Sequence, residues 1–543
     1  MELRDSTALL LGGTGLVGMA VARRLLTFEP ARIVVAGLTS DEVSAALAEL
    51  EPRAGKTAVE GVWGNIFVPE ALAQRSRESI LSDPEARRRV VDDYLGPFGS
   101  VPLEHNQLYA WLVRFEPDLV VDCVNTATAV AYQDGHASAL HLLAAADSNA
   151  VDRETVERHL LTLPIPQLIR HLEVLYGGMR RAGTKAYVKI GTSGTGGMGL
   201  DIPYTHSEQK PSRTLMSKSA VAGAQTLFLF LLGRTADAPA TIEIKPTAAI
   251  AWKEIAYGPI RRRGKVLEVV DCEQPIPLDA AFAPGVCGWV STGTPLENVF
   301  INVGENGVFA RDEFETVSSL GQMELVTPEE IAETVVMEVT GRPTGHDIIG
   351  ALDGATMGPT YRAGYLRAVA IEGLEKLEAA HGVRSVAFEM LGPPRLTKLL
   401  YEAFILGKLF PSVRSLAGAE PTALSREAEK LLRERDPALR RQILSVGLPI
   451  LLGDGSSILR GETVVVSPDG RGADTAQRGW VDLRPSNMEQ WIGRAAAMAA
   501  IPKDDSTGSS ARWTAVDADA PIAPPRMAVW IFEEEDHGVR VKR

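Results

Sequence analysis

The sequence has little of several features that mark common classes of protein. Only three of the 543 residues are cysteine, Cys123, Cys272 and Cys287, and no two of them form a CxxC pair. Three cysteines are too few, and odd in number, for a disulfide framework or a zinc-ligand cluster. We therefore expect no metal site. There is no secretory pattern at the start and no uninterrupted apolar run of membrane-spanning length. We therefore expect a cytoplasmic protein that does not bind a membrane.

The chain is also short of positive charge. It has 56 Lys and Arg against 69 Asp and Glu, which gives a formal net charge of -13. A nucleic-acid-binding protein needs a basic face that displaces counterions, so we expect no nucleic-acid partner. GxSxG, P-loop, HExxH and EF-hand patterns are missing too. Their absence leaves serine hydrolases, kinases and metalloproteases without support.

A glycine-rich turn joins the first predicted strand to the first predicted helix. Residues 7–11 form a short apolar run, and apolar residues recur at helical spacing from 16 to 26. Between them the glycines have the spacing GxxGxxG. The first two let the backbone turn and approach a pyrophosphate, and the third lets the helix pack closely against the strand. The helix N-terminus then offers unpaired N–H groups to an anion. We predict a nucleotide site here, with a purely structural turn as the alternative; the residues expected to bind are Gly12, Thr14, Gly15, Leu16, Val17 and Gly18.

Strands alternate with helices through the first half of the chain, which predicts a doubly wound α/β domain with a parallel sheet over residues 1–260. The charged, helical stretch 69–116 is longer than a crossover needs and is interpreted as a helical insertion. The pattern of residues 261–503 predicts a mixed α+β portion that serves substrate binding or assembly. Residues 504–543 are interpreted as a linker and a C-terminal edge segment, with a strand at 527–532. Single long helices are expected at 153–181 and 426–445.

The glycine loop and its surroundings resemble the short-chain dehydrogenase/reductase superfamily, particularly its extended, epimerase/dehydratase-like branch. The resemblance covers about residues 5–260. The segment DLVVDCV followed by Asn125 is similar to the family's fourth strand and its turn, and Gly64-Asn65-Ile66 is similar to the segment near the adenine. The resemblance places Ser193 at the catalytic serine and Lys218 at the catalytic lysine. It implies a Rossmann fold and NAD or NADP as cofactor, with Asn65, Asn125 and Lys218 contributing to its binding.

One position departs from the family pattern. The family's tyrosine stands four residues before the lysine, on the same helix face, where the lysine cation lowers the pKa of the phenol. In this sequence that position is Thr214, whose hydroxyl titrates far too high to exchange this proton. Tyr204, in a glycine-rich loop before Lys218, is a surrogate proton carrier or, equally, a packing tyrosine at a turn. Lys218 either holds the ribose hydroxyls or is an ordinary helix-surface lysine.

The choice between NAD and NADP stays open at the sequence level. An acid at the end of the second strand binds the ribose hydroxyls, whereas an arginine accommodates a 2′-phosphate. Here the segment is Ala36-Gly37-Leu38-Thr39-Ser40, which has neither. Thr39 is the candidate cofactor ligand, and its hydroxyl suits either group.

Three functions remain open. The first is an NAD(P)-dependent oxidoreductase, epimerase or dehydratase that acts by hydride transfer on a small polar substrate, with Ser193, Tyr204 and Lys218 at the reacting centre. The second is a lyase or isomerase that retains a bound dinucleotide. The third is a non-catalytic protein that senses a dinucleotide. We further expect a homo-oligomer.

Overall fold

The chain folds into two compact units. The first comprises Met1–Leu200, Pro211–Ala251 and Leu325–Arg362, and the second comprises Asp201–Lys210, Trp252–Glu324 and Ala363–Arg543. The computed structural model describes residues 1–96, 105–191, 213–246, 249–262, 264–304, 307–320, 325–342, 353–357, 361–388, 394–468, 472–501 and 517–536.

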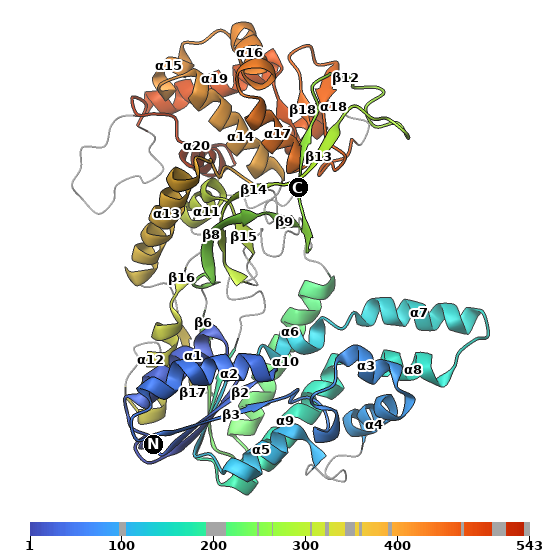
Figure 1. The fold of residues 1–543 in the computed structure, drawn as a ribbon, viewed down its shortest axis with the longest axis vertical. Helices are drawn as coiled ribbons and strands as arrows, with labels where there is room; N and C mark the ends of the chain where they lie inside the picture. Colours follow the sequence, from blue (N-terminus) through green and yellow to red (C-terminus); the bar gives the residue numbers. More distant parts are fainter. Residues whose placement is uncertain are drawn as a thin grey trace. The chain divides into compact units, whose positions relative to one another are not determined.

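A seven-stranded parallel sheet forms the centre of the first unit (Figure 1), which confirms the doubly wound α/β fold. The strand order is β17-β6-β5-β4-β1-β2-β3, so the chain runs outward from β1 to one edge, returns beside β1 with β4 and continues to the other edge. Such a reversal of strand order leaves a crevice at the carboxyl ends of the strands, where ligands bind in this fold. The strands are β1 (Thr7–Leu11), β2 (Arg32–Gly37), β3 (Ala58–Trp63), β4 (Leu119–Asp122), β5 (Ala186–Ile190), β6 (Ala240–Pro246) and β17 (Asp353–Met357).

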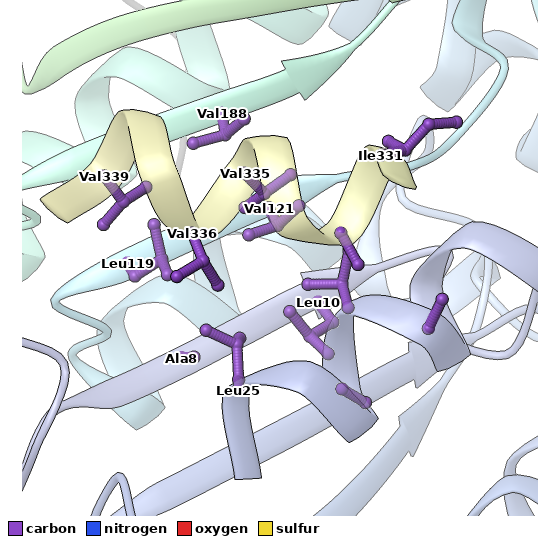
Figure 2. Packing of buried hydrophobic residues seen from close by; sticks show 14 of the residues in the cluster. Ala8, Leu10, Leu25, Leu119, Val121, Val188, Ile331, Val335, Val336 and Val339 are labelled. Atoms are coloured by element: carbon purple, nitrogen blue, oxygen red, sulfur yellow. The ribbon is translucent and has the colours of Figure 1, made fainter. Parts of the chain in front are cut away.

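Helices cover both faces of this sheet. As a result, nearly every residue of β1, β2, β4 and β5 is buried. On one face pack α1 (Leu16–Leu26), α2 (Ser40–Leu50) and α12 (Pro328–Thr340). Figure 2 shows Val335 and Val336 of α12 among the side chains of β1 and β4. The other face carries α5 (Gln107–Phe115), α6 (Thr126–Ala131), α9 (Pro164–Ala182) and α10 (Arg213–Gly233).

The segment Leu325–Arg362 returns to the first unit after the long excursion Trp252–Glu324. It adds helix α12 beside α1 and strand β17 beside β6 (Figure 1). The domain boundary predicted at residue 260 leaves both elements outside the sheet. The hydrophobic pattern of α12 shows one buried face but not which sheet that face covers, because the partners are distant in sequence.

The predicted insertion is helical, as expected. After a short 3₁₀ turn it contains α3 (Arg77–Ser82) and α4 (Pro84–Leu95), followed by α5. Helices α3 and α4 pack with Leu161 around a small core of their own, which includes Ile80, Val90 and Tyr94. The single helix expected at 153–181 is two helices, α8 (Arg153–Leu160) and α9, because Pro164 occupies the first turn of α9 and starts it afresh.

Helix α10 is, among the described helices, the one long and apolar enough to span a membrane by length and composition. It packs on β6, α6 and α9. Lys218, placed on this helix by the sequence, is buried rather than on the helix surface.

The second unit is mixed α and β. A three-stranded antiparallel sheet joins β8 (Glu254–Pro259), β14 (Glu297–Asn302) and β15 (Val308–Phe309). A second small sheet has the order β12-β19-β18-β20, made of β12 (Ile276–Pro277), β18 (Ile450–Leu451), β19 (Ser457–Leu459) and β20 (Val481–Asp482). The larger helices are α11 (Arg311–Ser319), α13 (Tyr361–His381), α14 (Pro394–Leu409), α16 (Pro421–Lys430), α17 (Pro437–Ser445) and α19 (Pro485–Ala500).

Two expectations for this unit are wrong. The edge strand expected at 527–532 is instead helix α20 (Pro524–Trp530) continued by a π-helical turn (Ile531–Glu535). A short, wholly buried apolar run does not distinguish strand from helix, and here Pro524 and Pro525 begin a helix. The helix expected at 426–445 is interrupted after a π-helical turn at Leu431–Arg435. Helix α17 then begins at Pro437, and its N-cap Asp436 accepts a hydrogen bond from the Leu439 N–H.

Candidate functional site

The glycines of the turn after β1 differ in why the structure accepts or requires a glycine there. Gly12 has φ +66°, in the left-handed region that favours glycine. A Cβ built on Gly18 would lie 2.5 Å from the Gly12 carbonyl oxygen and 2.5 Å from Gly13 Cα, so Gly18 permits α1 to pack against the turn. Gly15 is different: it has φ −77° and ψ 170°, and the nearest atom to its Cβ would be the Gly12 oxygen at 3.5 Å. Gly15 therefore has room for a side chain on the protein side.

The N-terminus of α1 differs from that of the neighbouring α2. Gly15 is the N-cap of α1, and no side chain caps this helix. In α2 the hydroxyl of Thr39 accepts from the Glu42 N–H at 3.4 Å, and the Glu42 carboxylate accepts from the Thr39 N–H at 3.3 Å. A helix start that its own chain leaves uncapped can supply its N–H groups and positive dipole to a phosphate.

A cavity of about 480 Å³ opens at the carboxyl ends of β1 to β4. One wall consists of residues from the glycine turn and from the ends of β2, β3 and β4: Gly12, Thr14, Gly15, Gly37, Leu38, Gly64, Asn65, Ile66, Cys123 and Val124. The other wall comes from the insertion, from α6 and the residues just after it, from the end of α8 and from α9. It includes Arg77, Ile80, Leu81, Val90, Tyr94, Gln133, Leu161 and Gln167. The volume falls in the range of ordinary ligand sites.

The polar groups of the second wall form a connected set. Gln133 and Gln167 exchange amide hydrogen bonds of 3.0 and 2.9 Å. The Leu161 carbonyl accepts from Gln167 Nε2 at 2.8 Å and from Arg77 Nη2 at 3.0 Å. Arg77 is exposed as a whole, yet the protein atoms around its guanidinium lower its pKa by desolvation, against a smaller opposing effect of Tyr94. Burial also raises the pKa of the Cys123 thiol to about 12, so this thiol is a poor nucleophile.

A buried ionic network lies under the turn that follows β4. The Asp122 carboxylate is 3.0 Å from Lys189 Nζ and accepts from the Tyr187 hydroxyl at 2.8 Å. Lys189 also donates to the Val124 carbonyl at 2.6 Å and to Thr126 Oγ1 at 3.2 Å. Because Val124 lines the cavity, this network fixes part of the cavity wall.

His171 of α9 lies behind the cavity. It is 4% exposed, and neither ring nitrogen has a hydrogen-bond partner among the described residues. Its ring centroid is 4.7 Å from that of Phe67, which lines the cavity. Burial lowers the pKa of His171 to about 4, so the imidazole is neutral near pH 7.

The predicted cofactor ligands divide into two groups. Gly12, Thr14, Gly15 and Asn65 line the cavity. The others have local roles that the structure shows: Leu16, Val17 and Gly18 form the first turn of α1, Thr39 caps α2, and Asn125 caps α6. The contribution of each to cofactor binding stays a prediction.

The predicted catalytic residues are only partly described. Ser193 and Tyr204 lie outside the described residues. The backbone at Thr214 is helical, in the first turn of α10. Lys218 is fully buried on the same helix, with Nζ 5.6 Å from the ring centroid of Tyr132. The part of the chain that the structure describes contains no cluster of possible metal ligands.

Several site residues were missed by sequence reasoning. Asp122 and Lys189 carried a usable signal, because each is a charged residue inside an otherwise apolar strand of a sheet buried on both faces. Arg77, Gln133 and Gln167 carried none, since their place at the cavity depends on the packing of the insertion.

One protein-family model matches the second half of the chain. Residues 269–536 match the model of the C-terminal domain of β-methylindole-3-pyruvate reductase. The matched family is a reductase family. No curated protein matches the sequence.

Among solved structures, the similar ones include several reductases. A short-chain dehydrogenase/reductase from Serratia marcescens is 14% identical, with 66% of this chain and 98% of that chain covered and a TM-score of 0.31. L-sorbose reductase from Gluconobacter frateurii, complexed with NADPH and L-sorbose, is 13% identical, with 66% and 97% covered and a TM-score of 0.30. The reductase/Diels-Alderase MalC from Malbranchea aurantiaca is 14% identical, with 46% and 74% covered and a TM-score of 0.26. Because these sequence identities and TM-scores are low, the fold is assigned from the strand order of the sheet itself.

Proposed function

We propose that this protein is a nicotinamide-dinucleotide-dependent reductase that converts a carbonyl group of a small polar substrate into an alcohol. The observation that carries the proposal is the cavity at the carboxyl ends of β1 to β4, which joins the glycine turn to the uncapped start of α1. A phosphate-binding turn beside a mostly apolar chamber fits a dinucleotide, because the pyrophosphate needs N–H donors and the adenine needs apolar surface. The reductase family matched by residues 269–536 supports the direction of the reaction.

Separate residues of this chain would bind the cofactor and transfer the proton in this reduction. Residues 12–18 would bind the pyrophosphate, and Asn65 would lie beside the adenine. When bound, the reduced cofactor supplies a hydride to the carbonyl carbon, and the carbonyl oxygen then takes a proton from the protein. We propose Tyr204 as the proton donor, with Ser193 orienting the carbonyl and Lys218 holding the ribose hydroxyls, because Thr214 occupies the position of the usual tyrosine.

The substrate class that we propose to test first is the 2-oxo acids. The family that matches residues 269–536 is named for a substituted pyruvate, which is a 2-oxo acid. A reductase is our choice over an epimerase, dehydratase, lyase or isomerase, because the matched family is a reductase family. Dinucleotide sensing without catalysis is the second candidate, and Thr214 is the observation that favours it.

A valine at Gly15 tests the proposed cofactor site without disrupting the fold. The backbone at Gly15 suits any residue, and its side chain would enter the cavity. Loss of the glycine N-cap costs only about 1 kcal/mol or less. We expect Gly15→Val to lose the rise in melting temperature that NAD or NADP gives the wild type, and to lose the consumption of reduced cofactor with 2-oxo acids.

The matched control is Gly493→Val, at a helical glycine of α19 with open space around its Cβ. This variant should bind cofactor and turn over as the wild type does. A wild type that neither cofactor stabilises would refute the dinucleotide site. A wild type that binds cofactor but consumes none with any carbonyl would favour the sensing function.

A further inference from the structure

The helical insertion gives the cofactor cavity a wall that a plain Rossmann domain lacks. Residues of α3 and α4 line the same cavity as the ends of β2 and β3, and the hydrophobic core of the insertion holds the two helices together. The wall is mostly apolar. Arg77 is its one lining residue with a cationic side chain among the described residues.

Arg77 lacks the partner that its neighbours have. Arg75 forms an ion pair with Asp83 at 2.9 Å, and Arg87 forms one with Glu157 at 2.9 Å. Arg77 forms no ion pair with any described residue, and its side chain donates to one acceptor, the Leu161 carbonyl. A guanidinium has five N–H donors arranged to fit a carboxylate or phosphate, so most of its donors are left for solvent or a ligand. Partial desolvation, seen in its lowered pKa, makes an anionic partner more favourable still.

The cavity also has an acid, Glu42, but the local structure explains it. Its carboxylate accepts from the backbone N–H groups of Leu38 and Thr39, each at 3.3 Å. These contacts make it part of the capping box at the start of α2, where a negative charge stabilises the helix. Glu42 therefore has a structural role without a ligand. Arg77 also has a local contact, at the Leu161 carbonyl that ends α8, but this contact uses one of its five N–H donors and no carboxylate offsets its charge among the described residues.

The place of the adenosine ribose follows from the fold. In a doubly wound domain the ribose hydroxyls of the adenosine half lie at the end of the second strand, which here is Gly37 with Leu38. Both residues line the same cavity as Arg77. The residues that follow, Thr39 and Ser40, supply neither the acid typical of NAD binding nor the arginine typical of NADP binding.

We propose that Arg77 binds the 2′-phosphate of NADP, so that the insertion, rather than the loop after β2, makes the protein prefer NADP to NAD. The inference rests on the proposed function. It goes beyond it by naming the cofactor and the residue that selects it.

The test is a pair of cofactor titrations on the full-length protein. NADPH and NADH are titrated separately into the wild type, Arg77→Gln and the control Arg75→Gln, with binding followed by cofactor fluorescence. We expect the wild type to bind NADPH more tightly than NADH. Arg77→Gln should weaken NADPH by about tenfold or more and leave NADH unchanged, because only the phosphate loses its partner. Arg75→Gln should change neither, because Arg75 is paired with Asp83.

A second measurement covers the case in which Arg77→Gln does not fold. Adenosine 2′,5′-bisphosphate should compete with NADPH for the wild type better than ADP does, and Arg77→Lys should reduce this advantage in part. A wild type that prefers NADH, or an Arg77→Gln variant that weakens both cofactors equally, overturns this inference alone. Failure of both cofactors to bind overturns it together with the proposed function.

Discussion

The buried His171 makes a sharp prediction about stability and pH. Its pKa is lowered from 6.5 to about 4, first by desolvation and in smaller part by Lys189, with Asp122 acting in the opposite direction. In the unfolded chain the imidazole takes up a proton near pH 6.5, whereas in the folded protein it does so only near pH 4. Between these values the unfolded state binds more protons, so the free energy of unfolding decreases as the pH falls. The shift corresponds to about 3 kcal/mol, lost between pH 6.5 and 4.

Replacement of His171 by leucine should remove this dependence. No hydrogen bond is lost, because both ring nitrogens lack partners among the described residues. We therefore expect a change of about 1 kcal/mol or less at pH 8, and a variant that exceeds the wild type in stability by up to about 3 kcal/mol near pH 4.5. Hydrogen exchange of the amides in β4 and β5, measured in increasing urea, reports the stability of this unit separately from the second.

The matched control is His141→Leu, at an exposed histidine of α7 (Gly135–Asp147). It should leave the pH dependence of the wild type as it is. Parallel stability curves for the wild type and His171→Leu between pH 4 and 7 would refute the reasoning, because they would mean that the buried imidazole does not titrate differently in the two states.

Two further substitutions test other parts of the site. Gly18→Ala places a Cβ 2.5 Å from the Gly12 oxygen, so the backbone must shift; we expect about 1–3 kcal/mol of destabilisation by urea unfolding and weaker cofactor binding, and an unchanged variant would contradict the close packing. Lys189→Met leaves the Asp122 carboxylate buried without its cation and should cost about 3–5 kcal/mol, whereas Lys189→Met with Asp122→Asn should cost clearly less. Equal losses in the single and double variants would show that the ion pair is not the cause.

The sequence by itself determined most of the central sheet, without β17, and its glycine turn. The apolar runs at β1, β4 and β5 are dictated by burial on both faces, and the GxxGxxG spacing requires a close approach of backbone at Gly12 and Gly18. These features depend on neighbours within a few residues, so the residue pattern is enough to predict them. The same reasoning showed that Thr214 departs from the usual family tyrosine.

Only the tertiary structure decided which distant segments meet. It brought α12 and β17 back to the first sheet, and it made helix α20 from an apolar run that also fitted a strand. Above all, it placed Arg77 of the insertion in the same cavity as the end of β2 and the glycine turn. Such contacts join residues far apart in the chain, and they are fixed by packing between elements, which the pattern within one element does not encode.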